Sequence, residues 1–278
     1  MELQIEQMVR LALDEDVGPR DLTTEAVIEP GTRARAQIRQ KQPGMLYGYE
    51  VAEAVFHHLD PMLEWRALLP EGEWRNDVPA AAVEIEGDAR PLLSGERVAL
   101  NFLQRLSGVA TLTAACVHQL RGTAVQVLDT RKTTPGLRLL EKRAVAAGGG
   151  RNHRMGLYDA VLVKDNHIAL AGGVGEATRR ALERRTPGVE VEVECSTLED
   201  VEEALEAGAK RLLLDNMDPR RLREVAERVG GRAELEASGS IGPGSVREVA
   251  DTGVQWISIG SLTHSAPALD LSMKIQPL

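Results

Sequence analysis

The chain after Thr123 alternates between short apolar runs and longer amphipathic stretches. Each run has the length of a buried strand, ends in a polar or small residue, and precedes a turn and a helix signal. Such alternation is typical of parallel strands joined by right-handed crossovers. The runs are VQVLDT at 125–130, AVLVK ending at Lys164, VEVEVEC ending at Cys195, RLLLD ending at Asp215, AELEASG ending at Gly239 and WISIG ending at Gly260. A complete eight-unit barrel takes about 250 residues, so we predict an incomplete parallel α/β barrel of about six strands.

The helix signals between these runs are specific in two places. Ser196 with Glu199 has the spacing of a capping box and predicts a helix over 198–207. Asp218 followed by Pro219 has the N-cap and N1 order that helix starts favour. Further helices are predicted over 137–147 and 174–185.

The first half of the chain has a mixed pattern. Helical spacing predicts helices over 5–13 and 50–59, and alternation predicts strands over 34–39 and 83–87. A long helix is predicted over about 94–120, bridging the two halves. We therefore expect an N-terminal α+β, sandwich-like domain at 1–107 and a barrel domain at 108–264, and the tail at about 265–278 could pack with the first domain.

Composition narrows the class of protein. A net charge of -9 argues against nucleic-acid or acidic-membrane binding, which needs a basic surface. Cys116 and Cys195 are far apart and form no CxxC pair, so neither a disulfide framework nor a zinc site is indicated. The start MELQIEQMVR has no apolar signal region, and no run approaches the ~18 apolar residues of a membrane span. We expect a protein of the reducing cytoplasm.

Candidate chemistry lies at the ends of the predicted strands. Parallel strands bring their carboxyl ends to one rim, so residues scattered in sequence converge there. Four or five cations would then face two carboxylates, a local positive focus that favours a polyanionic substrate. Two Gly/Ser turns could supply backbone amides to a phosphate. The residues at these ends are Arg131, Lys132, His153, Arg154, Lys164, Glu194, Asp215, Ser238, Gly239, Gly260 and Ser261.

Seven motifs of the sequence resemble, in order and spacing, those of the quinolinate phosphoribosyltransferase family. They are NFLQRLSGVAT, DTRKTTPGLR, GGGRNHRMGLYD, LVKDNH, VEVEC, LLLDN and EASGSI. The resemblance extends from EDVGPRDLTT to the C-terminus. Two residues depart from the family pattern: Arg20 stands where Gly is usual, and Ser240 where a second Gly is common. Ser240 keeps a hydroxyl donor in its loop, so we expect activity to be retained.

This resemblance implies phosphoribosyl transfer from phosphoribosyl pyrophosphate to quinolinate with decarboxylation, which gives nicotinate mononucleotide for NAD biosynthesis. It implies Mg²⁺ as cofactor and a homodimer whose sites are shared between the subunits. The dimer could also be part of a higher oligomer. Arg131, His153, Arg154 and Lys164 would hold the quinolinate carboxylates, with Arg105 reaching in from the partner subunit. Lys132, Glu194 and Asp215 would bind phosphoribosyl pyrophosphate and the metal. The implied substrate-binding set is completed by Thr130 and by a phosphate cradle of Ser238, Gly239, Ser240, Gly260 and Ser261.

Single residues admit plainer interpretations. Lys164 alone could form a rim salt bridge to Glu194, and Arg105 could be an interfacial or capping arginine. Glu190, Glu192 and Glu194 alternate with valines, so strand register decides which reaches the rim. We choose Glu194 because it stands at the strand end.

Three other functions fit parts of the pattern. A barrel aldolase would use Lys164 as a Schiff-base lysine, which borohydride trapping would detect. A non-catalytic anion-binding protein would have little use for Glu194 and Asp215. A nicotinate or nicotinamide transferase would need fewer cations than this rim offers.

Overall fold

The protein is described by a computed structural model that covers residues 2–278. The chain forms two compact units. Unit 1 comprises Met1–Leu112, Leu139–Gly148 and Ala266–Leu278, and unit 2 comprises Thr113–Arg138 and Gly149–Ser265. This division assigns the C-terminal segment to unit 1. The boundary expected at residues 107 and 108 stays a prediction.

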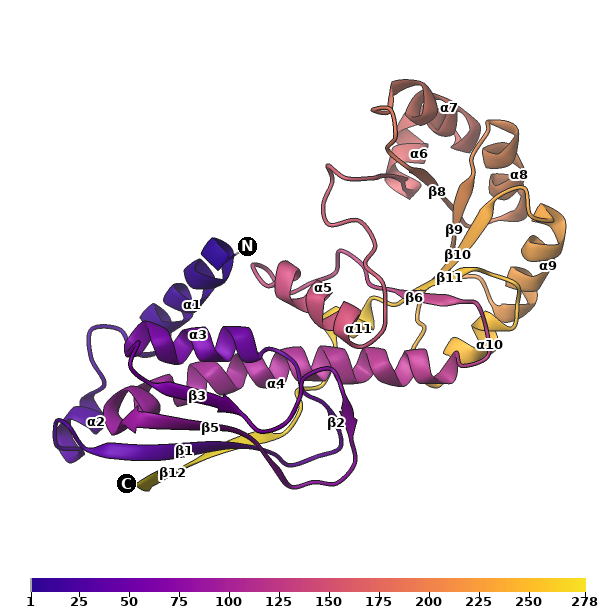
Figure 1. The fold of residues 1–278 in the computed structure, drawn as a ribbon. Helices are drawn as coiled ribbons and strands as arrows, with labels where there is room; N and C mark the ends of the chain where they lie inside the picture. The colour runs from indigo at the N-terminus through magenta and orange to yellow at the C-terminus, as the bar shows by residue number, and fades with distance from the viewer. Residues whose placement is uncertain (1) are drawn as a thin grey trace. The chain divides into compact units, whose positions relative to one another are not determined.

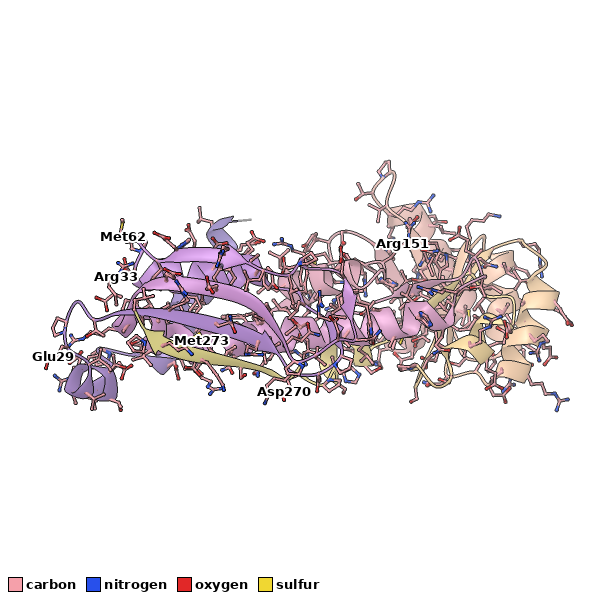
Figure 2. The ribbon with its side chains drawn as sticks, turned by 60° about the horizontal axis from the view of Figure 1, so that its bottom comes forward. Glu29, Arg33, Met62, Arg151, Asp270 and Met273 are labelled. Atoms are coloured by element: carbon pink, nitrogen blue, oxygen red, sulfur yellow. The ribbon has the colours of Figure 1, made fainter. Side chains whose placement is uncertain are left out.

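Unit 1 is built on a four-stranded antiparallel sheet in the order β12-β1-β5-β3 (Figure 1). Alternate residues of its central strand β1 are buried, as the sequence pattern predicts. Figure 2 shows Met273 on β12, the strand that pairs with β1. The strands are β1 (Arg33–Gln40), β5 (Ala80–Asp88), β3 (Glu64–Ala67) and β12 (Leu271–Pro277). A separate two-stranded antiparallel sheet pairs β2 (Gly44–Met45) with β4 (Trp74–Arg75). The helices are α1 (Glu2–Asp16), α2 (Leu22–Val27), α3 (Tyr49–Leu59), most of α5 (Arg138–Ala147), and α4 (Ala89–Gln119) as far as Leu112.

The long helix α4 begins five residues before the predicted start at Ser94 and carries a close approach at Gly108. A Cβ atom at Gly108 would lie 2.1 Å from the backbone oxygen of Pro267. Only glycine lets the C-terminal segment pass this near to the helix.

We expect Gly108→Ala to lower the free energy of unfolding by about 1–3 kcal/mol, because the backbone must move to admit the methyl group. Gly175→Ala is the matched control, since this helical glycine has no neighbour closer than 3.6 Å. It should be neutral or stabilising by up to ~1 kcal/mol. Urea unfolding of both variants measures the difference, and equal midpoints would contradict the packing argument.

Unit 2 contains a six-stranded parallel sheet in the order β6-β11-β10-β9-β8-β7. In the described residues the outer strands β6 and β7 do not pair with each other, so the sheet stays open, as expected of an incomplete barrel. In Figure 1 helices α7, α8 and α9 lie along one face of it. The strands are β6 (Gln126–Leu128), β7 (Val161–Val163), β8 (Val191–Cys195), β9 (Arg211–Asp215), β10 (Glu234–Ser238) and β11 (Trp256–Ser258). The helices are α6 (Asp165–Ala171), α7 (Val174–Arg184), α8 (Leu198–Glu206), α9 (Pro219–Val229), α10 (Val246–Ala250) and α11 (Ser261–His264).

Strand register aligns the strand ends. Asp215 pairs with Ser238, and Ser238 with Ser258. Polar ends of neighbouring strands therefore stand at one level, which is the geometric premise of the predicted rim.

Of the two helix starts predicted from capping residues, the structure confirms one and shifts the other. Asp218 caps α9 by accepting from the Arg221 amide, with Pro219 at the first position, so that prediction is confirmed. The capping box of α8 was placed one residue too early. Thr197 is the N-cap and exchanges hydrogen bonds with Asp200, because β8 extends to Cys195 and Ser196 completes the turn.

The cysteines are buried and unpaired, as expected. Burial raises the pKa of Cys116 to about 11, so this thiol is protonated at neutral pH. Within residues 2–278 no helix combines the length and the apolar character needed to cross a bilayer.

Candidate functional site

A cavity of about 310 Å³ opens at the carboxyl ends of the unit 2 strands. Nine of the predicted site residues line it, and they come from the ends of five strands or the loops that follow them and from the loop before β7. The lining residues are Thr130, Arg131, Lys132, His153, Arg154, Leu162, Lys164, Glu194, Leu213, Asp215, Glu236, Ser238 and Ser258. Cations and carboxylates that are scattered in sequence thus share one cavity.

The cavity wall carries polar atoms that lack protein partners. Arg131 Nε, Glu236 Oε1 and Ser258 Oγ are buried and make no hydrogen bond within the described residues. Buried polar groups are normally satisfied, so groups left open at a cavity indicate that a polar ligand or water completes them. A polar molecule, and not an apolar one, fits this wall.

Lys164 and Glu194 form one side of the cavity. Lys164 stands at the start of α6, directly after β7, and its Nζ lies 3.6 Å from Glu194 Oε2. The salt bridge between Lys164 and Glu194 that the plainer interpretation predicts is therefore present, and the same two residues also line the cavity. Burial raises the pKa of Glu194 and Asp215 adds to this shift, whereas Lys164 opposes it.

The loop after β6 places Arg131 and Lys132. The Lys132 amide donates to Thr130 Oγ1 at 3.0 Å, and Thr263 Oγ1 donates to the Lys132 carbonyl at 2.7 Å. Arg138 donates to Thr133 Oγ1 and to the carbonyls of Arg131 and Met155. It therefore ties the Arg131 loop to the loop that follows Arg154.

His153 and Arg154 enter from the loop before β7. The buried carboxylate of Asp129 accepts from the His153 amide at 2.9 Å and from Asn152 Nδ2 at 2.6 Å. His153 Nε2 lies 2.9 Å from Glu192 Oε2, and the Arg154 amide donates to His153 Nδ1 at 2.7 Å. Burial, followed by the charge of Arg131, lowers the pKa of Arg154.

The predicted phosphate cradle borders the cavity but does not line it, apart from Ser238. A Cβ at Gly260 would lie 3.1 Å from Lys132 Cδ, so this glycine leaves room for the lysine stem. Gly239 has a φ of +145° and would clash with Asn216, which explains glycine at this turn. Ser240 follows it, and Ser261 begins α11.

Arg105 belongs to unit 1, on α4. Its Nε and Nη2 donate to Glu141 Oε1 at 3.0 and 2.8 Å, and its Nη1 donates to the Ala266 carbonyl at 3.1 Å. Glu141 is fully buried. The arginine therefore has a structural ion pair inside its own unit, and its function at a shared site stays a prediction.

Beneath the cavity lies a buried charged cluster of His153, Glu192, Arg211 and Glu236, here called the floor cluster. Arg211 donates to Glu192 at 3.0 Å and to Glu236 at 2.8 Å. The three glutamates in and just before β8 thus have different places: Glu190 precedes the strand and is exposed, Glu192 belongs to the floor cluster, and Glu194 lines the cavity.

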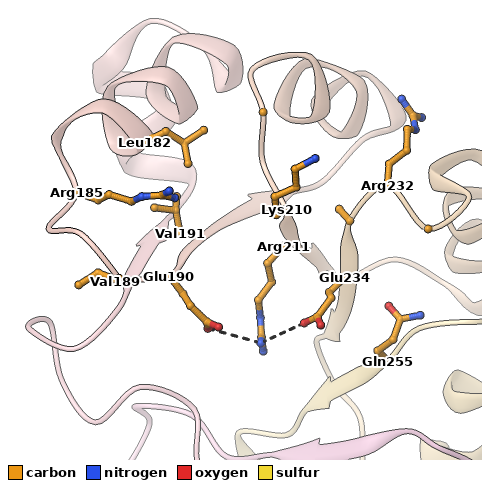
Figure 3. Close-up of a pocket in the computed structure, with 14 residues that line it drawn as sticks. Leu182, Arg185, Val189, Glu190, Val191, Lys210, Arg211, Arg232, Glu234 and Gln255 are labelled. Carbon is orange, nitrogen blue, oxygen red and sulfur yellow. Dashed lines mark ion pairs between the residues drawn. The ribbon is translucent and has the colours of Figure 1, made fainter.

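A larger cavity, of about 970 Å³, lies at the amino ends of β8, β9 and β10 (Figure 3). Figure 3 shows Arg211 between Glu190 and Glu234, at 4.0 and 3.7 Å. This cavity contains none of the predicted site residues. Because barrel active sites form at the carboxyl ends of strands, the smaller cavity is the candidate site.

Three polar residues of the site were missed from the sequence. Glu236 and Ser258 line the cavity, and Arg138 holds its loops. Glu236 could have been found, because it stands two residues before Ser238 and so faces the same side of β10. Arg138 is the last residue of DTRKTTPGLR, so the resemblance to the family, and not the strand-end pattern, is the signal that could have found it.

Two family models match the chain. The quinolinate phosphoribosyl transferase N-terminal domain covers residues 21–107, and the C-terminal domain of the same family covers residues 109–274. The chain belongs to the quinolinate phosphoribosyltransferase family.

Similar full-length proteins agree with membership in the quinolinate phosphoribosyltransferase family. The chain is 41% identical to a probable nicotinate-nucleotide pyrophosphorylase (carboxylating) of Bacillus subtilis, over 98% of this chain and 94% of the relative. It is 40% identical to the chloroplastic nicotinate-nucleotide pyrophosphorylase (carboxylating) of Arabidopsis thaliana, over 98% and 82%. The crystal structure of NadC from Streptococcus pyogenes matches at a TM-score of 0.94 and 40% identity, over 100% of this chain and 98% of that one.

Proposed function

We propose that this protein transfers the phosphoribosyl group of phosphoribosyl pyrophosphate to quinolinate and releases carbon dioxide, pyrophosphate and nicotinate mononucleotide. The observation that carries this proposal is the single cavity in which Arg131, Arg154 and Lys164 face Glu194 and Asp215. Cations suit a dicarboxylate and carboxylates suit ribose hydroxyls, so one cavity offers recognition for both substrates. The relatives named above carry the same activity in their names.

Quinolinate binding is assigned to the cationic side of the cavity, at Arg131, His153, Arg154 and Lys164. An arginine fork bonds a carboxylate through two parallel N–H groups, and Arg131 Nε has no protein partner in the described residues. A dianion would satisfy this open donor.

Phosphoribosyl pyrophosphate is assigned to the adjoining acidic part of the cavity, where Glu194 lies beside Lys164. Lys132, Glu194 and Asp215 would lie near the ribose and pyrophosphate, with Thr130 beside them. The turns at Ser238, Gly239, Ser240, Gly260 and Ser261 would bind the 5-phosphate through backbone amides. The absence of side chains at Gly239 and Gly260 supports this, because a Cβ at Gly239 would lie 2.7 Å from Asn216 Oδ1 and one at Gly260 would lie 3.1 Å from Lys132 Cδ.

Magnesium fits the acidic side of the cavity. Glu194 and Asp215 end neighbouring strands and offer hard oxygen ligands, directly or through water and pyrophosphate, which suit Mg²⁺. When bound, the ion would supply positive charge to the leaving pyrophosphate.

The chain's own residues then account for the remaining chemistry. Glu194 or Asp215 stabilises the positive charge that develops on the ribose as pyrophosphate departs, and the pyridine nitrogen attacks the anomeric carbon. The quaternary nitrogen allows the adjacent carboxylate to leave as carbon dioxide. Arg131, Arg154 and Lys164 hold the substrate through these steps, and no side-chain nucleophile is required.

Activity should be lost when divalent metal is removed, because an uncompensated pyrophosphate is a poor leaving group. We expect excess EDTA to abolish turnover and added MgCl₂ to restore it, measured as nicotinate mononucleotide formation. Full turnover in excess EDTA would contradict the assignment of Glu194 and Asp215. Zinc analysis of the purified protein should find no structural ion.

The decisive experiment is incubation with quinolinate, phosphoribosyl pyrophosphate and Mg²⁺, with nicotinate mononucleotide and carbon dioxide as products. Nicotinate and nicotinamide in place of quinolinate test the related transferases. A borohydride-trapped adduct on Lys164 would instead support an aldolase. We further propose that the protein forms a homodimer with sites shared between the subunits, alone or within a higher oligomer. We also propose that it is located in the cytoplasm.

A further inference from the structure

Glu236 is a fully buried carboxyl group that nevertheless lines the candidate site. It lies on β10, two residues before Ser238 and on the same face, and its neighbour across β9 is Leu213. It thus forms part of the floor of the 310 Å³ cavity. Nothing in the reaction as described so far uses it.

The two oxygens of Glu236 have different surroundings. Oε2 accepts from Arg211 Nη2 at 2.8 Å. Oε1 has no hydrogen-bond partner within the described residues, and His153 Nε2 lies 3.6 Å from it. A buried carboxylate oxygen without a donor is costly, whereas a protonated one can donate to a ligand in the cavity.

The charges of the floor cluster call for an additional proton. Two buried carboxylates, Glu192 and Glu236, share one guanidinium, and Arg211 also lies near the exposed Glu190 and Glu234. One buried negative charge is therefore uncompensated unless a proton neutralises it. His153 accepts from the Arg154 amide at Nδ1 and donates from Nε2 to Glu192, so the neutral ring satisfies both bonds and the proton belongs on Glu236 Oε1.

A metal ion is the alternative neutralising charge. The ligand atoms of His153, Glu192 and Glu236 lie within 4.8 Å of one another. Arg211 already donates to both carboxylates from this space, and its side chain stacks on Trp256 at 4.9 Å. The guanidinium occupies the place of a cation, which favours a proton on the cluster.

Decarboxylation creates a need for an acid at this place. When the carbon–carbon bond breaks and carbon dioxide leaves, its electron pair stays on the ring carbon beside the quaternary nitrogen, and that carbon must then gain a proton. We propose that Glu236 is the acid that gives its Oε1 proton to this carbon, with Arg211, Glu192 and His153 holding it in position. This inference rests on the proposed function. After transfer Glu236 is a carboxylate bonded to Arg211, and solvent returns the proton.

The pKa of Glu236 agrees with this assignment. Burial, then the charge of Glu192, raises it to about 7, against the opposing effects of His153 and Arg211. Burial lowers the pKa of His153, but the bond to Glu192 and the charge of Glu236 raise it by more. Because the increase at His153 depends on an ionised Glu236, only one of the two groups holds the proton, and the hydrogen bonds of His153 place it on Glu236. The charged groups that interact with Glu236 are His153, Glu192 and Arg211. The other charged residues that line the same cavity are Arg131, Lys132, Arg154, Lys164, Glu194 and Asp215.

The test compares Glu236→Gln, which keeps the shape but cannot titrate, with Glu236→Asp, which keeps the acid. Glu234→Gln is the matched control, because it lies on the same strand but is exposed and lines the other cavity. For each variant, circular dichroism checks folding, and kcat and KM for quinolinate are measured between pH 5.5 and 9, buffer values set around the pKa of about 7. Calorimetry in buffers of different ionisation enthalpy measures protons taken up when quinolinate binds at high pH.

We expect wild-type kcat/KM to fall as pH rises through about 7, and quinolinate binding above that pH to take up close to one proton. Glu236→Gln should lose about 10²-fold or more in kcat with little change in KM, and should lose both the pH inflection and the proton uptake. Glu236→Asp should be slower but keep the inflection, and Glu234→Gln should match the wild type.

Three results would overturn the proposal: a Glu236→Gln enzyme near wild-type kcat with the inflection retained, a loss that appears only in KM, or wild-type binding without proton uptake. If Glu236→Gln does not fold, the inflection in Glu236→Asp and the wild-type proton uptake decide the question. A wild-type protein that makes no nicotinate mononucleotide refutes the proposed function, a result distinct from an active wild type with an unaffected Glu236→Gln.

Discussion

Replacing Lys164 or Arg154 by alanine should reduce quinolinate turnover by roughly 10³-fold, since each removes a cation that faces the dianion inside a confined cavity. Folding should be retained. The side chain of Lys164 is 46% exposed and forms an ion pair with Glu194, so its loss should cost at most about 1 kcal/mol of stability.

Steady-state kinetics with quinolinate, together with thermal unfolding, measure both effects. Lys210→Ala and Arg185→Ala are the matched controls, because these cations line the larger cavity at the other ends of the strands. Near-wild-type turnover in both Lys164→Ala and Arg154→Ala would show that the wrong cavity has been assigned. Inactive control variants would mean that general electrostatics, and not the cavity, governs the rate.

Two inactive variants should restore each other's activity if Arg105 acts in the partner's site. Arg105→Ala by itself is a poor reagent, because it removes the guanidinium from the buried Glu141, and breaking a buried ion pair costs about 3–5 kcal/mol. We therefore combine Arg105→Ala with Glu141→Gln in one chain and place Lys164→Ala in the other. Glu141→Gln alone serves as the control and should stay active.

Mixing equal amounts under conditions of subunit exchange makes about half of the dimers mixed, and each mixed dimer has one site without a lesion at Arg105 or Lys164. Activity should therefore recover to about a quarter of that of Glu141→Gln. Differently tagged chains verify the exchange. Exchange without recovery would assign Arg105 to its own subunit or to folding alone.

The repeating half of the fold could be predicted from the sequence because its signals are local. Each buried strand of unit 2 is a short apolar run, and the start of α9 follows from Asp218 and Pro219. The strands β3 and β12 could not be predicted in this way. Three of the four residues of β3 are exposed, and β12 forms by pairing with β1, which lies far away in sequence.

The residues of the candidate site also differ in whether they could be predicted from local signals. Cations and carboxylates at strand ends were predictable, because parallel topology brings such ends together. Glu236 and Arg138 were not chosen, because their parts depend on where Arg211 and two loops lie in three dimensions. The ion pair of Arg105 with Glu141 also joins α4 to α5 across a stretch of sequence that periodicity does not connect.

The strand β12 also sets the order in which the molecule can be completed during synthesis. Its residues Leu271–Pro277 follow all of unit 2 in the chain, yet they form the edge of the sheet that begins with Arg33–Gln40. Translation runs from the amino terminus, so the parallel sheet of unit 2 has its full set of strands available before β12 is made. Until β12 has been made, β1 lacks its second neighbour, and that edge of β1 stays open to pairing with other chains.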